Sequence, residues 1–359
     1  MPKFPPGVEE GIARYQNGLV LQSSDLSLGA ISNMVTKQAI DVSPTFQRRD
    51  RWQSVAQSRL IESFLLNIPV PPVYLSEDSG GTYSVIDGKQ RITAIHQFMT
   101  GGLTLSGLEV LHKLNGFSIT DFPASIANSL DVRPYVRTVT LLRQSNERVR
   151  YEVFLRLNIA GVPLSPMEIR KVAFRGMYCD MVFAEAENEF LKRQLKIKTT
   201  ESSAYQKMVD AELVLRFLTL RETWERFSGD YRNAMDLHME RHHDLMSSEV
   251  VSAANSFKRA MHFCERLWGA RAFQRPDGDG WRNQALAGVY DSEMVAVDVL
   301  SDGLLELASS RTQAVLLATR DLFECDQEFT AAATMATNTP SRVRYRIEAM
   351  KNLLVNVAG

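Results

Sequence analysis

The chain has 359 residues, of which 45% are apolar, and its formal net charge is −1. That length predicts two or three domains with a large core, and the near-neutral charge gives no global sign of nucleic-acid binding. The three cysteines lie far apart without a CxxC pair, which argues against a disulfide framework and a structural zinc site. No signal peptide opens the chain and no apolar run approaches the roughly 20 residues that span a bilayer, so we expect a cytoplasmic protein with no membrane partner.

Positive charge is slightly concentrated in the first half of the chain. Residues 1–175 carry 19 Lys and Arg against 15 Asp and Glu, whereas the remainder carries 22 against 27. Fourteen of the 19 cations are arginines, whose planar guanidinium suits phosphate and carboxylate groups. The asymmetry is too mild to identify a function by itself.

The first half of the chain predicts a mixed α/β pattern. Residues 1–24 are punctuated by Pro and Gly and predict a loose arm. Hydrophobic spacing then predicts helices over residues 25–37, 55–67 and 145–157, and strands over residues 40–42, 73–75, 83–86, 103–105 and 136–142. Residues 73–86 read as a hairpin, because two Gly lie in the loop between their two strands.

The second half predicts helices with almost no strand signal. A capping box at Ser165 and Glu168, with Pro166 between them, marks a helix start. Further helices are expected over residues 179–195, 205–227, 247–269, 283–300, 312–323 and 341–355. The predicted fold class is therefore α+β, with a mixed domain over residues 1–175 and an all-helical domain over residues 176–359.

The most informative stretch is YSVIDGKQRITAIHQF, residues 83–98, which predicts a strand, a tight turn and a helix. Asp87 is a good N-cap and Gln90 completes a capping box, so a purely structural interpretation exists. That interpretation leaves Lys89 and Arg91 unexplained, because cations in a first helical turn oppose the macrodipole at a cost of about 0.3–1 kcal/mol each. A bound anion would make the two cations favourable in this turn. A glycine next to Asp87 also lets a phosphate approach the backbone.

Two polar segments flank this stretch. Residues 46–52 place Arg48, Arg49 and Arg51 within four positions, ahead of Trp52. A solvated loop anchored by the indole is the simple alternative to an anion site there.

The second segment is Arg-Leu-Asn at residues 156–158, near a predicted helix end. Arg156 could offset the helix dipole and Asn158 could form the helix exit, so this segment also has a simple alternative.

Together these blocks resemble a known family. In order they are FQR…W, LIESFLLNIPVPPVYL, YSVIDGKQRITAIHQF and VFLRLNIAGVPLSPMEIRKVAF. The sequence resembles the N-terminal domain of GmrSD-type restriction endonucleases, which has a ParB/sulfiredoxin-like fold and an Asp-Gly-Gln-Gln-Arg hallmark. Lys89 departs from the hallmark, which usually has Gln there, and keeps the turn cationic. No HNH-like nuclease block follows.

The resemblance implies nucleotide binding and often NTP hydrolysis, coupled in defence proteins to cutting or sensing DNA. It places Asp87, Gln90 and Arg91 in the hallmark as catalytic candidates. The nucleotide- and phosphate-binding candidates are Gln47, Arg48, Gly88, Lys89, Arg156 and Asn158. The expected cofactor is a nucleoside triphosphate with Mg²⁺, with Asp87 as the metal ligand or the group that orients a water.

Other interpretations stay open. A non-catalytic DNA-binding module would use the Arg-rich half, including Arg49 and Arg51, and a ParB-like nuclease would cut DNA itself. No GxxxxGK[ST] P-loop occurs, which excludes an ATPase of that class. DNA, a separately encoded nuclease subunit and a second copy of the chain are candidate partners.

His238 and His242 lie one helical turn apart, which is a spacing compatible with a metal site. The glutamate of an HExxH motif is missing, and we expect a polar helix end rather than a metal site.

Overall fold

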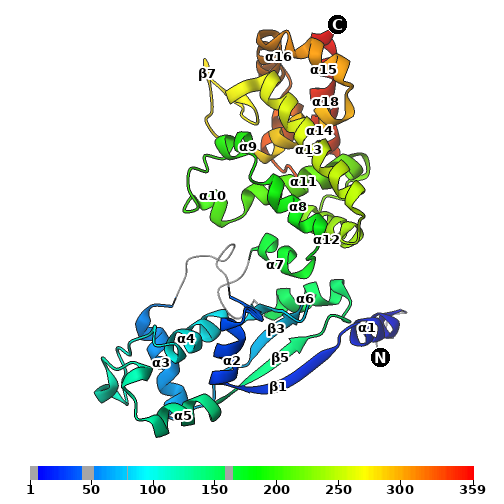
Figure 1. Cartoon of the computed structure of the whole chain (residues 1–359). Helices are drawn as coiled ribbons and strands as arrows, with labels where there is room; N and C mark the ends of the chain where they lie inside the picture. The colour runs from blue at the N-terminus through cyan, green and yellow to red at the C-terminus, as the bar shows by residue number, and fades with distance from the viewer. Residues whose placement is uncertain (1–6, 43–51, 79, 158–164) are drawn as a thin grey trace, which may run out of the picture. The chain divides into compact units, whose positions relative to one another are not determined.

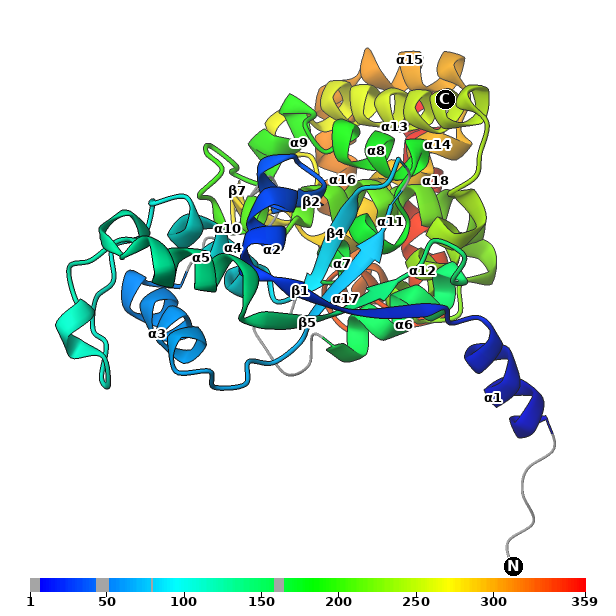
Figure 2. The same ribbon diagram turned by 60° about the horizontal axis from the view of Figure 1, so that its bottom comes forward.

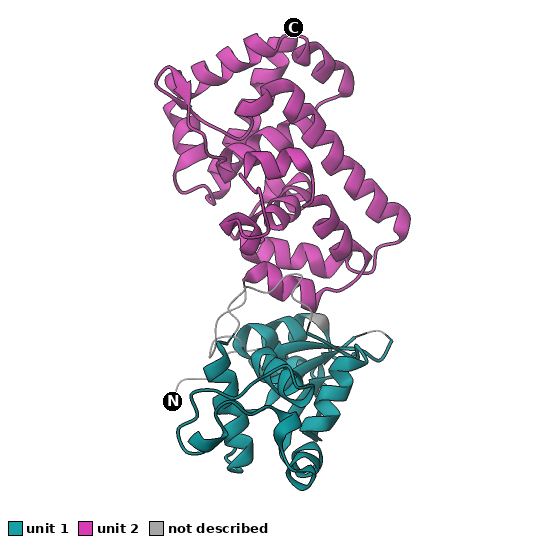
Figure 3. Ribbon diagram, turned by 60° about the vertical axis from the view of Figure 1, so that its left-hand side comes forward, with its two compact units in different colours: residues 1–164 teal, residues 165–359 magenta. Residues whose placement is uncertain are grey.

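The computed structural model describes residues 7–42, 52–78, 80–157 and 165–359. The chain divides into two compact units, residues 1–164 and 165–359, and each is described by itself (Figure 3). We expected the division after residue 175. Helix α7 (Pro166–Ala173), which begins at the capping box of Ser165 and Glu168, instead lies with the second unit.

The first unit is built on a five-stranded mixed sheet in the order β1-β5-β3-β4-β2. β3 and β4 form the expected antiparallel hairpin, β5 runs parallel to β3, β1 antiparallel to β5, and β2 parallel to β4. The strands are β1 (Leu21–Ser27), β2 (Ile40–Asp41), β3 (Val73–Glu77), β4 (Tyr83–Asp87) and β5 (Tyr135–Leu141).

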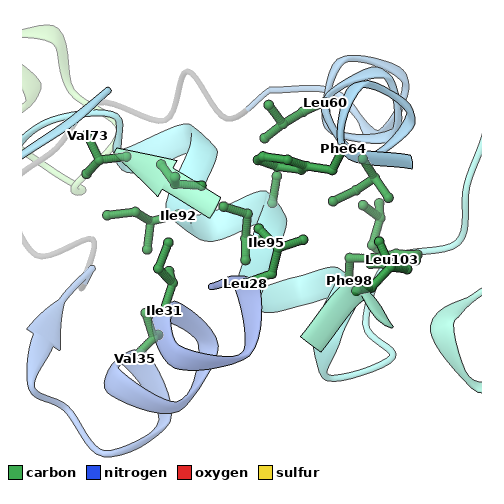
Figure 4. Close-up of a cluster of buried hydrophobic side chains, with 14 of the residues drawn as sticks. Leu28, Ile31, Val35, Leu60, Phe64, Val73, Ile92, Ile95, Phe98 and Leu103 are labelled. Carbon is green, nitrogen blue, oxygen red and sulfur yellow. The ribbon is translucent and has the colours of Figure 1, made fainter. Parts of the chain in front are cut away.

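Four helices cover one face of this sheet (Figures 1 and 2). They are α2 (Leu28–Thr36), α3 (Ser54–Leu65), α4 (Lys89–Met99) and α5 (Ala124–Val132). Figure 4 shows apolar side chains of α2, α3, α4 and β3 in one cluster, with Ile92 of α4 beside Val73 of β3 and Phe64 of α3 on the side of Ile95 of α4. This layer fixes α4, and with it the start of the helix, against the sheet.

Helix α6 (Glu147–Leu157) packs on the opposite face. Leu75 of β3 lies in the core described above, and the next residue, Ser76, accepts a hydrogen bond from Arg150 Nη2 of α6 at 2.7 Å. Successive strand residues point to opposite faces, so this bond places α6 on the second face. Phe154 of α6 is fully buried.

The second unit is helical apart from one small hairpin of β6 (Pro276–Asp277) and β7 (Gly280–Trp281). Helix α14 (Ala287–Val299) is buried along most of its length and packs against α11, α13, α17 and α18. The other helices are α8 (Met177–Glu185), α9 (Glu189–Gln194), α10 (Ser203–Gln206), α11 (Val209–Thr223), α12 (Tyr231–His242), α13 (Ser247–Trp268), α15 (Asp302–Ser309), α16 (Thr312–Cys325), α17 (Gln327–Thr334) and α18 (Pro340–Ala358). Within the described ranges, no helix is long and apolar enough to cross a membrane.

The α+β fold class is confirmed, and several element predictions are corrected. The predicted N-terminal arm contains helix α1 (Val8–Asn17) and strand β1. β1 has the polar sequence LQSSDLS and is stabilised by pairing with β5 along its whole length, which no local pattern indicates. Residues 103–105 do not form a strand; Leu103 and Leu105 are buried from an irregular segment instead.

Candidate functional site: the turn between β4 and α4

The turn from β4 into α4 is formed by Asp87 and Gly88. Asp87 is the last residue of β4, and α4 begins at Lys89. Gly88 has φ +94°, in the left-handed region that favours glycine. A Cβ atom on Gly88 would lie 2.9 Å from Val73 Cγ2 and 3.0 Å from Arg91 Nη2, so both backbone conformation and space require glycine here.

The predicted capping box is wrong. Gly88, not Asp87, occupies the N-cap position, and no side chain within the described residues caps the start of α4. Gln90 Oε1 instead accepts a hydrogen bond from the backbone N–H of Trp52 at 3.2 Å. The carboxylate of Asp87 is engaged elsewhere, which explains why the local capping pattern was not realised.

Asp87 is held by Arg91, one turn into the helix. Arg91 Nη2 lies 2.7 Å from Asp87 Oδ2 and also donates to the carbonyl oxygen of Pro72 at 3.0 Å. The Arg91 side chain is 15% exposed and that of Asp87 is 39% exposed. The guanidinium therefore ties the end of β4, the segment before β3 and the first turn of α4 into one rigid corner.

Three features of this corner suit an anion. Among the described residues, no side chain caps the positive end of the α4 dipole. Arg91 Nε is buried and has no hydrogen-bond partner within the described part of the chain. Lys89 adds a second cation in the same turn, at a half-buried position. The arrangement can hold a phosphate group and neutralise its charge.

The remaining candidates are less closely tied to the turn. Arg156 lies on α6, its side chain is 79% exposed, and its Nε lies 3.7 Å from Glu152 Oε2. The other candidates from the flanking segments lie outside the described residues: Gln47, Arg48, Arg49, Arg51 and Asn158.

Sequence reasoning missed three backbone or packing contributions to the site: the Pro72 carbonyl, the Val73 side chain and the Trp52 amide. Pro72 and Val73 precede the turn by about fifteen residues, and only the hairpin pairing of β3 with β4 brings them to it. The consecutive prolines at 71 and 72 predict an extended segment. They do not indicate that the Pro72 carbonyl accepts a hydrogen bond from Arg91.

A family model matches part of the chain. Residues 31–175 match the sequence model of a family described as "GmrSD restriction endonuclease, N-terminal domain". Searches of the curated proteins and of the solved structures found no match to the chain. The matched range contains the sheet strands β2 to β5 and the whole β4–α4 turn.

Proposed function

Residues 31–175 belong to the GmrSD restriction endonuclease N-terminal domain family, and from that premise we propose that this part of the chain binds a nucleoside triphosphate at the β4–α4 turn. We further propose that it hydrolyses the nucleotide as a regulatory component of a restriction or anti-phage system that acts on DNA. The proposal goes beyond the family description, which names a restriction endonuclease domain and no nucleotide.

One observation carries the proposal: two cations meet at a glycine in the left-handed conformation, at a helix start that no described side chain caps. A cation in a first helical turn is unfavourable unless it is compensated. Asp87 compensates Arg91 in part, at the single oxygen that lies 2.7 Å away. A phosphate at this helix start would take the buried Arg91 Nε and the Lys89 ammonium as further partners.

Asp87 fits the role of a Mg²⁺ ligand. Magnesium in nucleotide sites is held by one or two carboxylates together with substrate phosphates, and several waters complete its shell. Arg91 orients the Asp87 side chain through Oδ2, while the partial exposure of this carboxylate leaves it open to a solvated ion. When bound, the ion would neutralise charge on the phosphates.

Each residue of the turn would have its own role in phosphoryl transfer. Positioning and charge neutralisation are the main requirements of that chemistry. Arg91 and Lys89 would hold the phosphates, and Asp87 would orient the attacking water. Gln90, whose side chain is fixed by the Trp52 backbone, would use its amide group to hold the same water or a phosphate oxygen.

We propose that a separately encoded subunit takes part in the DNA cleavage that the family name describes. Nucleotide occupancy of the turn would then control that subunit or its access to DNA. A complex of several copies is compatible with this role.

A thermal-shift and phosphate-release screen tests the proposal. GTP, ATP, CTP and UTP, each at 1 mM with Mg²⁺, are compared on the purified full chain. We expect at least one of them to raise Tm, because a ligand that binds only the folded state stabilises it. Asp87→Asn should abolish phosphate release, whereas Asp25→Asn, which removes an exposed ion pair with Arg137 in the same unit, should retain it.

The outcomes separate the alternatives. A Tm shift without phosphate release supports binding without hydrolysis. No shift with any nucleotide, together with salt-dependent DNA affinity that is lost on changing Arg49 and Arg51 to Ala, would favour the DNA-binding module. Metal-dependent DNA cleavage by the purified chain, abolished by Asp87→Asn, would favour a nuclease.

A further inference from the structure

A second polar site lies in the helical unit, where α11 and α12 pack together. Glu222 is near the end of α11, and His238 and His242 lie one turn apart on α12. Tyr178 of α8 contacts both histidine rings, with centroids 5.6 Å from His238 and 5.2 Å from His242. His238 is fully buried, so the expectation of a polar helix end is wrong for this residue.

The three side chains point potential ligand atoms at one another. His238 Nδ1 lies 3.5 Å from Glu222 Oε2, and His242 Nε2 lies 3.1 Å from Glu222 Oε1. One ligand atom from each residue falls within 4.8 Å of the other two. A zinc ion with bonds of about 2.0–2.2 Å places its tetrahedral ligand atoms roughly 3.3–3.6 Å apart. The two nitrogen–oxygen distances, one to each oxygen of Glu222, are close to this spacing, so the cluster has about the dimensions of a site for a cation of that size.

The hydrogen bonds behind the histidines orient the rings for this purpose. His242 Nδ1 lies 2.8 Å from the carbonyl oxygen of His238. A carbonyl can only accept, so Nδ1 carries the hydrogen and Nε2 faces Glu222. His238 Nε2 lies 2.6 Å from the Tyr178 hydroxyl, which leaves Nδ1 facing the carboxylate. Partners of this kind on the second ring nitrogen are a regular feature of metal-binding histidines.

A buried nitrogen without a partner is the strongest sign that something is bound. His238 Nδ1 is inaccessible to solvent and makes no hydrogen bond with any described residue. Leaving a buried polar atom unpaired is unfavourable, and nearly all such atoms in folded proteins have a partner. An ion pair of His242 with Glu222 would account for those two residues and leave His238 Nδ1 with no closer polar contact than Glu222 Oε2 at 3.5 Å.

We propose that Glu222, His238 and His242 bind a divalent transition-metal ion of the zinc class. Two imidazoles and one carboxylate suit such an ion, whereas Mg²⁺ and Ca²⁺ prefer oxygen ligands alone. The Glu222 side chain is 35% exposed, so the ion reaches solvent on that side and takes water as its fourth ligand. The ion joins α11 to α12 and stabilises the helical unit.

Metal binding to the full-length protein tests the proposal. The chain is dialysed against EDTA and then titrated with ZnCl₂, with bound zinc measured by mass spectrometry and Tm by calorimetry. We expect one zinc per chain and a zinc-dependent rise in Tm. Co²⁺ in place of zinc should give the visible absorption bands of a four-coordinate site.

Matched variants separate this site from adventitious binding. Glu222→Gln and His242→Gln keep side-chain size and should bind zinc at least tenfold more weakly. His243→Gln is the control, because His243 Nε2 lies 3.0 Å from Asp244 and the residue is not one of the three ligands. Fewer than about 0.1 zinc per wild-type chain, or equal zinc binding by wild type and both ligand variants, would overturn the proposal. If a variant fails to fold, the Co²⁺ spectrum of the wild type still tests the proposal, because the absence of four-coordinate absorption bands would contradict it.

Discussion

Arg91 reaches back one helical turn to Asp87, with 2.7 Å between Nη2 and Oδ2, and the same nitrogen donates to the carbonyl of Pro72. The contact joins the two ends of the β4–α4 turn across a glycine that no other residue could replace without strain. It makes Asp87 the partner of a cation rather than a helix cap. The first two predictions concern this corner of the site.

Arg91→Lys should weaken the corner and the nucleotide site together. A lysine ammonium is a point charge on a flexible stem, so it would hold the Asp87 carboxylate and the Pro72 carbonyl less rigidly than the planar guanidinium does, and it has no counterpart to the buried Nε. Because the pair is partly exposed, we expect a loss of about 1 kcal/mol in the free energy of unfolding. Nucleotide affinity should fall tenfold or more. Urea unfolding and nucleotide titration measure the two effects; a variant with unchanged affinity would remove Arg91 from the site.

Gly88→Ala should destabilise the first unit by about 1–3 kcal/mol, because a non-glycine residue in the left-handed region is strained and its Cβ meets Val73 and Arg91. Gly80→Ala is the matched control. Gly80 has φ +82°, yet a Cβ there meets no atom within 4 Å, so only the backbone cost of about 1 kcal/mol remains. Equal unfolding free energies for the two variants would contradict the close packing of the turn.

Asp291→Asn should destabilise the helical unit strongly. Asp291 is buried and accepts hydrogen bonds from Arg216 at 2.6 and 2.7 Å and from Tyr231 at 2.8 Å, and it also pairs with Arg346. Burial alone would raise its pKa, but the two guanidiniums hold the pKa of this carboxyl below its usual value.

Removing the charge leaves two buried arginines uncompensated, for which we expect a cost of about 3–5 kcal/mol. Urea unfolding of Asp291→Asn checks this. Asp302→Asn, which breaks an exposed pair with Arg259, should change stability by less than about 1 kcal/mol. A small effect of Asp291→Asn would mean that the buried network contributes little to stability.

Asp210 should make stability depend on pH. Asp210 is buried at the start of α11, and burial raises its pKa to about 6 from the ordinary 3.8. Between these values the folded chain binds the proton more tightly than the unfolded chain does, so Asp210 lowers the stability as pH rises from about 4 to about 6.

Asp210→Asn should therefore gain about 1–3 kcal/mol at pH 8, at 1.36 kcal/mol per pH unit, and gain nothing near pH 3.5. An asparagine can keep the hydrogen bond from the Ala211 amide. Asp321→Asn, which removes a carboxylate at an exposed position, serves as the control. The unfolding free energies of wild type and the two variants are measured from pH 3.5 to 8. Parallel pH profiles would contradict the raised pKa of Asp210.

The strand–turn–helix around Asp87 was predictable because its signals are local: alternation in the strand, Asp-Gly at the turn and helical spacing after it. The capping box failed because two tertiary contacts competed for its members, Arg91 for Asp87 and the Trp52 amide for Gln90. Helix propensity and capping rules consider neighbouring residues only, so they cannot predict such tertiary contacts.

Non-local pairing accounts for the other differences. Strand β1 is polar and gains its hydrogen bonds from β5, which lies more than a hundred residues further along the chain. Glu222 is sixteen residues from His238, and only the packing of α11 on α12 brings it to the histidines. The spacing of His238 and His242 was the one available signal of that cluster.

The most direct test of nucleotide binding at the β4–α4 turn is a calorimetric titration of Mg²⁺–NTP into wild type, Lys89→Glu and Lys113→Glu. Both variants change the net charge by −2, and Lys113 is an exposed residue of the same unit that lies outside the turn. We predict that Lys89→Glu raises Kd at least tenfold, whereas Lys113→Glu leaves it within twofold of wild type. No binding of any nucleoside triphosphate by the wild type at millimolar concentration, or the same Kd for all three proteins, would contradict the account.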